Sequence, residues 1–327
     1  MHDRKNLLNP REIPVLALAP MAGITDLPFR LICKKFGADI VYSEMVSATG
    51  LFYDSKKTFD LMQTIPEESP MILQLFGNEP AHFQKAAEII SSLPEKSTAD
   101  LPAKPQGIDI NFGCPQKKIF KQGSGCALMK DFKKSREIIE ATLKGATLPL
   151  SIKIRAGIKN KTAFDFLDNI GELDWKTLMI HGRTFEEGFA GPINVELVKE
   201  IKKIFPNKNI FVNGGIDTPE NAKEIIEKTS ADGIGIARGA LGNPWIFQQT
   251  KDFFENGEYS KPSQEEVIKT ALEHINLFEE YRKATNPAEL KKHLFWYIKN
   301  FEGARKIRQQ IMTAETIEEM ENIISKI

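Results

Sequence analysis

Short apolar runs alternate along the chain with longer segments in which apolar residues recur at helical spacing. The short runs are rich in β-branched residues and predict eight strands, at residues 15–18, 39–42, 71–75, 107–110, 150–154, 177–180, 210–212 and 233–236. Helical periodicity predicts helices near 27–36, 81–91, 132–143, 163–170, 195–204, 219–228 and 244–249. Continuous apolar strands of this kind are typical of a parallel sheet covered by helices.

Eight strands in this alternation favour an α/β protein with a closed (β/α)8 TIM barrel over an open, doubly wound sheet. An open sheet that binds a dinucleotide would carry a G-x-G-x-x-G turn after its first strand. The first strand is followed instead by APMAG at 19–23, which lacks that spacing. We therefore predict a barrel domain over residues 1–250.

The strand pattern stops near residue 251, and the rest of the chain has helical periodicity. Amphipathic segments at 265–281, 288–301 and 317–324 predict helices, and Ser263 with Glu266 fits an N-terminal capping box. We expect residues 251–327 to form a small all-helical domain.

Composition limits the class of protein. The 327 residues are 41% hydrophobic and 27% charged, with a formal net charge of zero, so a nucleic-acid partner would require a local basic patch. No apolar run reaches the length of a membrane span, and the N-terminus does not resemble a signal peptide. The three cysteines are an odd, sparse set, which indicates a reducing compartment, and the cytoplasm is the expected location.

Polar residues crowd the carboxyl ends of the predicted strands, where barrel enzymes carry their active sites. So many polar groups at one rim indicate a functional site, because buried charge is costly without a partner. Gly214 and Gly215, with Arg238 after the last strand, are suited to hold a phosphate, although glycine pairs also form plain turns. Lys153 and Gln74 are expected at the same rim, where they would contact a bound cofactor; for Lys153 the alternative is a salt bridge with a rim carboxylate, Glu44 or Asp109.

The three cysteines differ in their sequence settings. Cys33 and Cys126 fit packed positions, whereas Cys114 lies in a Gly-Cys-Pro loop at the predicted rim. A thiol with a pKa near 8.5 is mostly protonated at neutral pH and can act as a general acid. We expect no metal site, since no C-x-x-C pair is present and the histidines are few and scattered.

Four segments resemble the signatures of tRNA-dihydrouridine synthases: APMAGITD at 19–26, DINFGCP at 109–115, HGRT at 181–184 and RGALGNPW at 238–245. Their order and spacing extend the resemblance over residues 14–327. The resemblance implies reduction of the C5=C6 bond of tRNA uridines to 5,6-dihydrouridine by FMN, with NADPH as reductant. The chain departs from the family at Gly215, where Asp is common, at Cys126, and at Phe185, Glu187 and Phe189 in the loop after HGRT.

The resemblance also implies roles for residues at the strand ends. Cys114 would protonate a flipped-out base on the face opposite the flavin, and Asn111 would read the polar edge of that base. FMN would be held by Pro20, Met21, Ala22, Gln74, Lys153, His181, Asn213, Gly214, Gly215, Ala237 and Arg238. Contacts to the substrate are expected from Asn111, Lys117, Lys118, Arg155, Arg183, Lys291, Lys292, Arg305 and Arg308.

Basic residues gather in the predicted helical domain. Between positions 282 and 308 the chain holds eight basic residues against two acidic ones: Arg282, Lys283, Lys291, Lys292, Lys299, Arg305, Lys306 and Arg308. A solvated helical face over an aromatic core would explain any one of them. As a group they predict a phosphate-contacting patch, so we expect a tRNA-binding domain at 251–327. Separately, we expect the protein to be a monomer.

Two other functions fit part of the sequence. A flavin barrel that acts on a free small molecule, such as a dihydroorotate- or dihydropyrimidine-type dehydrogenase, would share the barrel and the phosphate site. It would not need the basic helical segment. A non-catalytic RNA-binding protein that kept a barrel would hold no flavin and would not depend on Cys114.

Overall fold

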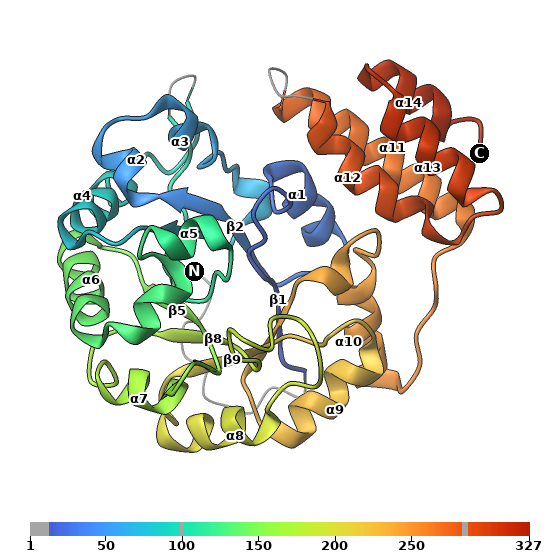
Figure 1. Ribbon diagram of the computed structural model, residues 1–327. Helices are drawn as coiled ribbons and strands as arrows, with labels where there is room; N and C mark the ends of the chain where they lie inside the picture. Colours follow the sequence, from blue (N-terminus) through green and yellow to red (C-terminus); the bar gives the residue numbers. More distant parts are fainter. Residues whose placement is uncertain (1–12, 99–100, 283–286) are drawn as a thin grey trace.

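Eight parallel strands close into a barrel, in a computed structural model that describes residues 13–98, 101–282 and 287–327 (Figure 1). The order around the barrel is β1-β10-β9-β8-β5-β4-β3-β2. The strands are β1 (Val15–Leu18), β2 (Ile40–Ser47), β3 (Met71–Phe76), β4 (Gly107–Asn111), β5 (Leu150–Arg155), β8 (Thr177–His181), β9 (Asn209–Asn213) and β10 (Gly233–Ile236). The predicted (β/α)8 barrel is confirmed, and β2 is longer than its apolar run because it continues past a register shift.

A ring of helices surrounds the barrel (Figure 1): α1 (Leu27–Lys35), α4 (Pro80–Ser91), α6 (Phe132–Gly145), α7 (Ala163–Asp168), α8 (Val195–Ile204), α9 (Pro219–Thr229) and α10 (Ile246–Asn256). The connections carry shorter elements: α2 (Ala48–Phe52), α3 (Lys56–Asp60), η1 (Pro66–Glu68), α5 (Lys117–Lys121), η2 (Gly125–Lys130), the hairpin β6 (Gly157–Ile158) and β7 (Lys161–Thr162), and η3 (Arg238–Ala240). The hydrophobic pattern does not predict these elements, because none is long enough to repeat a period.

The barrel interior is filled below its carboxyl rim. Along β1, Leu16 packs in the core shared with the helices, whereas Ala17 packs inside with Tyr42, Met179 and Phe211. Gly235 leaves space for Met179, since a Cβ at this position would lie 2.8 Å from Met179 Sδ. The filled interior leaves the strand ends as the place where a ligand can enter.

The chain after the barrel forms a group of helices with its own hydrophobic core. These are α11 (Gln264–Tyr281), α12 (Ala288–Tyr297), η4 (Ile298–Asn300), α13 (Ala304–Thr313) and α14 (Ile317–Ile324). They lie together on one side of the barrel, and α11 packs against α1 (Figure 1). The predicted capping box of Ser263 and Glu266 begins α11. The sequence pattern did not predict α13.

The proposed division between residues 250 and 251 stays a prediction. Helix α10 continues past it to Asn256, and α11 begins at Gln264. In the part of the chain that the structure describes, no helix combines the length and the apolar character needed to cross a bilayer.

A buried ion pair joins α1 to the turn before β3. Arg30 Nε lies 2.6 Å from Glu68 Oε2, and Arg30 Nη2 lies 2.9 Å from Glu68 Oε1. The guanidinium also donates to the carbonyl oxygens of Thr25 and Gln63. Both side chains of the pair are almost completely buried, so each charge depends on the other for compensation.

Replacing Glu68 by Ala is expected to lower the free energy of unfolding by about 3–5 kcal/mol, because it leaves the Arg30 charge buried without its partner. Urea denaturation followed by circular dichroism measures the change. Glu200→Ala is the matched control: it breaks the exposed pair with Lys203, and we expect a change below about 1 kcal/mol. Equal effects of the two substitutions would contradict this account.

Candidate active site

The carboxyl end of the barrel opens into a cavity of about 860 Å³. Most residues predicted from the sequence for the site line it: Pro20, Met21, Ala22, Gln74, Asn111, Cys114, Lys117, Lys153, Arg155, His181, Arg183, Asn213, Gly214, Gly215, Ala237 and Arg238. The structure therefore brings these residues together around one space. The role of each residue stays a prediction.

Strand register explains why these side chains meet. Asn111 is the partner of Lys153, His181 is the partner of both Arg155 and Asn213, and Asn213 is the partner of Gly235. Because side chains alternate between the two faces of a strand, residues paired in this way share both height and direction. Asn111 and Lys153 thus lie at the level of Met179, at the top of the apolar interior, and Arg155, His181 and Asn213 form a polar level above it.

A chain of buried hydrogen bonds crosses the floor of the cavity. Ser151 Oγ and Gln74 Nε2 donate to the Asp109 carboxylate at 2.5 and 2.6 Å, and Asn111 Nδ2 donates to Gln74 Oε1 at 2.8 Å. Burial raises the pKa of Asp109 to about 6, although these hydrogen bonds favour its charged form. The network fixes the orientation of the Asn111 amide.

Asn111 in turn holds the loop that carries Cys114. Asn111 Oδ1 accepts the backbone N–H groups of Gly113 and Cys114 at 3.0 and 2.8 Å. Arg155 Nε donates to the Gly113 carbonyl at 2.9 Å, and Arg155 Nη1 donates to the carbonyls of Thr184 and Gly188. Both ends of the Asn111 amide are engaged within the protein, so its geometry fits a positioning role better than the predicted contact to a base.

The Cys114 thiol is largely buried from solvent. Cys114 lines the cavity and is 9% exposed. Burial raises the pKa of this thiol above its usual value, and a hydrogen bond from the backbone of Gln116 and the nearby Lys153 only partly oppose that effect. The sulfur therefore keeps its proton at neutral pH, as a general acid requires.

Lys153 and His181 form a cationic and a neutral group on adjacent strands. Lys153 Nζ donates to Asn213 Oδ1 at 3.1 Å, and none of the ion pairs within the described residues involves Lys153. Burial, reinforced by Arg155, lowers the pKa of Lys153 to about 8. Burial and the charge of Lys153 lower the pKa of His181 to about 2, which keeps its ring neutral. The salt bridge considered for Lys153 does not form.

Backbone and arginine groups form a cradle after β9. Gly214 and Gly215 have φ angles of 105° and 71°, and a Cβ on Gly214 would lie 3.0 Å from His181 Nε2 and 3.2 Å from Arg183 Nη1. Arg183 Nε donates to the Gly191 carbonyl, but Arg183 Nη1 is buried and has no partner among the described residues. An unpaired guanidinium N–H beside bare backbone indicates a site for an anion.

The cavity lining also includes residues that the sequence did not single out for the active site. Met45 and Phe189 come from the barrel, and Trp296 and Lys299 come from the C-terminal helices. The guanidinium groups of Arg155 and Arg238 lie over the Phe189 ring. Their Cζ atoms are 5.5 and 4.6 Å from the ring centroid. Lys299 belongs to the basic group at 282–308 and Trp296 lies in the same stretch, but no local signal separates them from their neighbours.

The remaining predicted substrate contacts lie outside the cavity lining: Lys118, Lys291, Lys292, Arg305 and Arg308. Lys292 Nζ lies 3.5 Å from the Gly23 carbonyl oxygen, across the contact between the helices and the barrel. Lys291 Nζ donates to the Met312 carbonyl, and Arg308 stacks over the Phe295 ring at 4.9 Å. Lys283 lies outside the described residues.

The fold and the cavity define a (β/α)8-barrel enzyme with a thiol, buried cations and an anion cradle at its strand ends. The family model described as "Dihydrouridine synthase (Dus)" matches residues 17–327, and the chain belongs to this family. The tRNA-dihydrouridine synthase B of Pseudomonas aeruginosa is 33% identical over 301 residues, which cover 90% of this chain and 87% of that protein. The protein of the same name from Vibrio parahaemolyticus is 34% identical over 299 residues, covering 90% and 89%.

A comparison of solved structures supports the fold alone. The 6-hydroxypseudooxynicotine amine oxidase of Pseudomonas geniculata N1 aligns with a TM-score of 0.56 and 12% identity. The alignment covers 88% of this chain and 55% of that one, so the chain spans about half the length of that structure.

The buried Lys153 amine should titrate with a midpoint near pH 8 in NMR of protein labelled with carbon-13 lysine. Unfolded lysine keeps its proton to about pH 10.4, so between these values the unfolded chain binds more protons and this group's contribution to stability rises with pH. Asp109→Asn should move the midpoint lower, because the Asp109 charge raises the pKa of Lys153.

An assignment variant and a reference lysine allow the Lys153 titration to be interpreted. Lys153→Met identifies the resonance, and exposed Lys203, whose pKa its partner Glu200 raises, should titrate above the ordinary lysine range. A Lys153 midpoint equal to or above that of Lys203 would contradict the proposed desolvation.

Proposed function

We propose that this protein is a tRNA-dihydrouridine synthase that reduces the C5=C6 bond of uridines in tRNA, with FMN as its redox cofactor and NADPH as reductant. Membership in the dihydrouridine synthase family supports this assignment. The observation that carries it is the placement of the Cys114 thiol in the same cavity as Lys153 and the glycine–arginine cradle. A protonated thiol and an anion site are the two features that this reaction needs from the chain.

The residues at the rim fit FMN. The cavity volume of about 860 Å³ falls within the range of about 300–1,000 Å³ that is usual for ligand sites. Gly214, Gly215 and Arg238 would hold the phosphate, and the unpaired Nη1 of Arg183 is suited to join them. Lys153 would lie against the isoalloxazine ring, where its positive charge favours the reduced, anionic form. When bound, FMN supplies hydride to the base.

The chain itself would deliver the proton and exclude water. A uracil ring stacked in RNA cannot reach the strand ends of a barrel, so the nucleotide must be flipped into the cavity. The Cys114 thiol would then donate its proton to C5 of the base, as the partner of the hydride that the cofactor supplies. Asn111 and Arg155 would act through this loop, by holding the backbone of Gly113 and Cys114 in place.

The tRNA would meet the protein over the rim and the C-terminal helices. The chain is neutral as a whole, so phosphate contacts require local positive charge. Lys117 on one side of the cavity and Lys299 on another provide such charge, and Trp296 offers a ring on which a base can stack. The more distant basic residues Lys118, Lys291, Lys292, Arg305 and Arg308 would extend this surface. Three free cysteines suit the reducing cytoplasm.

The purified protein should be yellow and show the visible absorbance of bound FMN, whereas Gly214→Ala should largely lose it. The added Cβ would lie 3.0 Å from His181 Nε2 and occupy the cradle. Gly257→Ala is the matched control: Gly257 also has a positive φ, of 76°, but a Cβ there meets nothing within 4 Å. Equal flavin retention in the two variants would count against the cradle, and colourless, folded wild-type protein would count against flavin binding.

Cys114→Ala should retain FMN and still oxidise NADPH, but lose about 10²–10⁴-fold of its rate of dihydrouridine formation, since the general acid is missing. Single-turnover assays with unmodified tRNA measure this step. Cys126→Ala is the control, because Cys126 is also buried but does not line the cavity. An unchanged rate in Cys114→Ala would exclude this thiol as the proton donor.

A further inference from the structure

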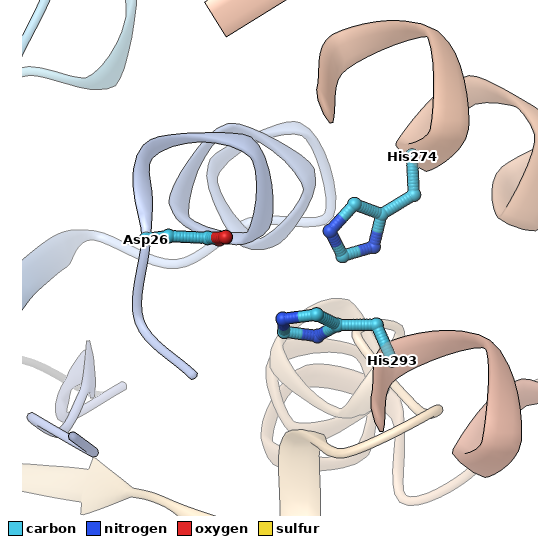
Figure 2. A group of neighbouring side chains, drawn as sticks. All are labelled: Asp26, His274 and His293. Carbon is cyan, nitrogen blue, oxygen red and sulfur yellow. The ribbon is translucent and has the colours of Figure 1, made fainter. Parts of the chain in front are cut away.

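Two histidines and an aspartate meet at the contact between the barrel and the C-terminal helices. Asp26 is the N-cap residue of α1, His274 lies on α11, and His293 lies on α12. One ligand atom from each residue can be chosen so that all three lie within 4.8 Å of one another. Both imidazole rings turn toward the Asp26 carboxylate (Figure 2). The three side chains are 5%, 0% and 3% exposed, so bulk solvent does not satisfy them.

The hydrogen bonding of His274 leaves one nitrogen unused. His274 Nδ1 lies 3.3 Å from the Tyr297 hydroxyl, whereas His274 Nε2 is buried and has no partner among the residues that the structure describes. A hydrogen bond at one ring nitrogen that leaves the other free is the usual arrangement of a metal-binding histidine. Ring packing among Phe29, His274 and His293 accounts for their contacts but not for the unpaired nitrogen.

Arg282 and Arg30 are close enough to act on the charge of Asp26, but neither forms an ion pair with it. Arg30 is paired with Glu68, and Arg282 is paired with Glu289 at 2.7 Å. Asp26 Oδ1 accepts the Phe29 N–H at 3.1 Å, and no described lysine or arginine forms an ion pair with this carboxylate. Each imidazole ring offers a nitrogen as a further ligand atom, so the cluster combines one carboxylate with two imidazole donors.

We propose that Asp26, His274 and His293 bind a divalent transition-metal ion, best matched by Zn²⁺, which fastens the C-terminal helices to the barrel. Imidazole and carboxylate are common Zn²⁺ ligands, and a water molecule would complete the tetrahedron. Ligands at about 2.0–2.1 Å from the ion lie about 3.4 Å apart, so ligand atoms that lie up to 4.8 Å apart must approach one another by up to about 1.4 Å. His293 precedes Trp296 by three positions on α12, so the ion would also steady the helix that reaches the cavity mouth.

The test uses the full chain, purified without chelator and analysed for zinc by mass spectrometry. We expect one zinc ion per chain, and after removal of the metal we expect stoichiometric rebinding in competition with a chromophoric chelator. Replacement by Co²⁺ should produce the visible absorption of a tetrahedral nitrogen and oxygen site. Zn²⁺ should also raise the Tm of the metal-free protein in a concentration-dependent manner, as a ligand of the folded state does.

Substitutions separate this site from adventitious binding. His293→Gln and Asp26→Asn should abolish stoichiometric zinc. Tyr297→Phe, which keeps all three ligands, should weaken binding about 10–100-fold. His82→Gln, at a histidine on α4 away from the cluster, should change nothing. If the ligand variants do not fold, the wild-type zinc content, cobalt spectrum and Tm shift still decide. Absence of stoichiometric zinc in the wild type, or zinc that persists in folded His293→Gln, would overturn the proposal.

Discussion

The fixed register of the closed parallel barrel is the constraint on which the rest of this protein depends. Each strand delivers its last residues to the same end, and the pairing of Arg155, His181 and Asn213 sets them at one height. Backbone hydrogen bonds around the whole barrel hold this level, so no single side chain has to create the site. A slip of one residue in any strand would turn its polar end outward.

Burial at the rim then shifts the pKa values of several side chains. The pKa of Lys153 falls, His181 stays neutral and the Cys114 thiol keeps its proton. These effects share one cause, which is the removal of water from groups whose charged forms need it. The lining holds six lysines and arginines against one acidic residue, Asp217, so the cavity is electropositive within a neutral chain. Such a cavity suits an anionic ligand and a substrate that carries phosphates.

The C-terminal helices are joined to the barrel through groups that also matter near the cavity. Asp26 begins α1 in the segment that follows Met21 and Ala22, while His293 lies on the helix that brings Trp296 to the cavity. Lys292 reaches back to the Gly23 carbonyl beside them. Trp296 and Lys299 from these helices line the cavity, so the C-terminal part of the chain contributes to its wall as well as to its charge.

The sequence by itself determined the eight strands, their order and the residues at their carboxyl ends, because alternation of strand and helix is a local pattern and eight such units favour closure into a barrel. It also determined the thiol loop and the glycine pair. Only the tertiary structure decided that Asn111 Oδ1 accepts hydrogen bonds from the backbone of the Cys114 loop, and that Arg183 Nη1 has no partner among the described residues. The tertiary structure also decided that Trp296 and Lys299 line the cavity. The expectation of no metal site rested on the scatter of histidines along the chain, yet folding brings His274 and His293 to Asp26. Proximity between distant segments depends on how whole helices pack, and no local pattern of residues encodes it.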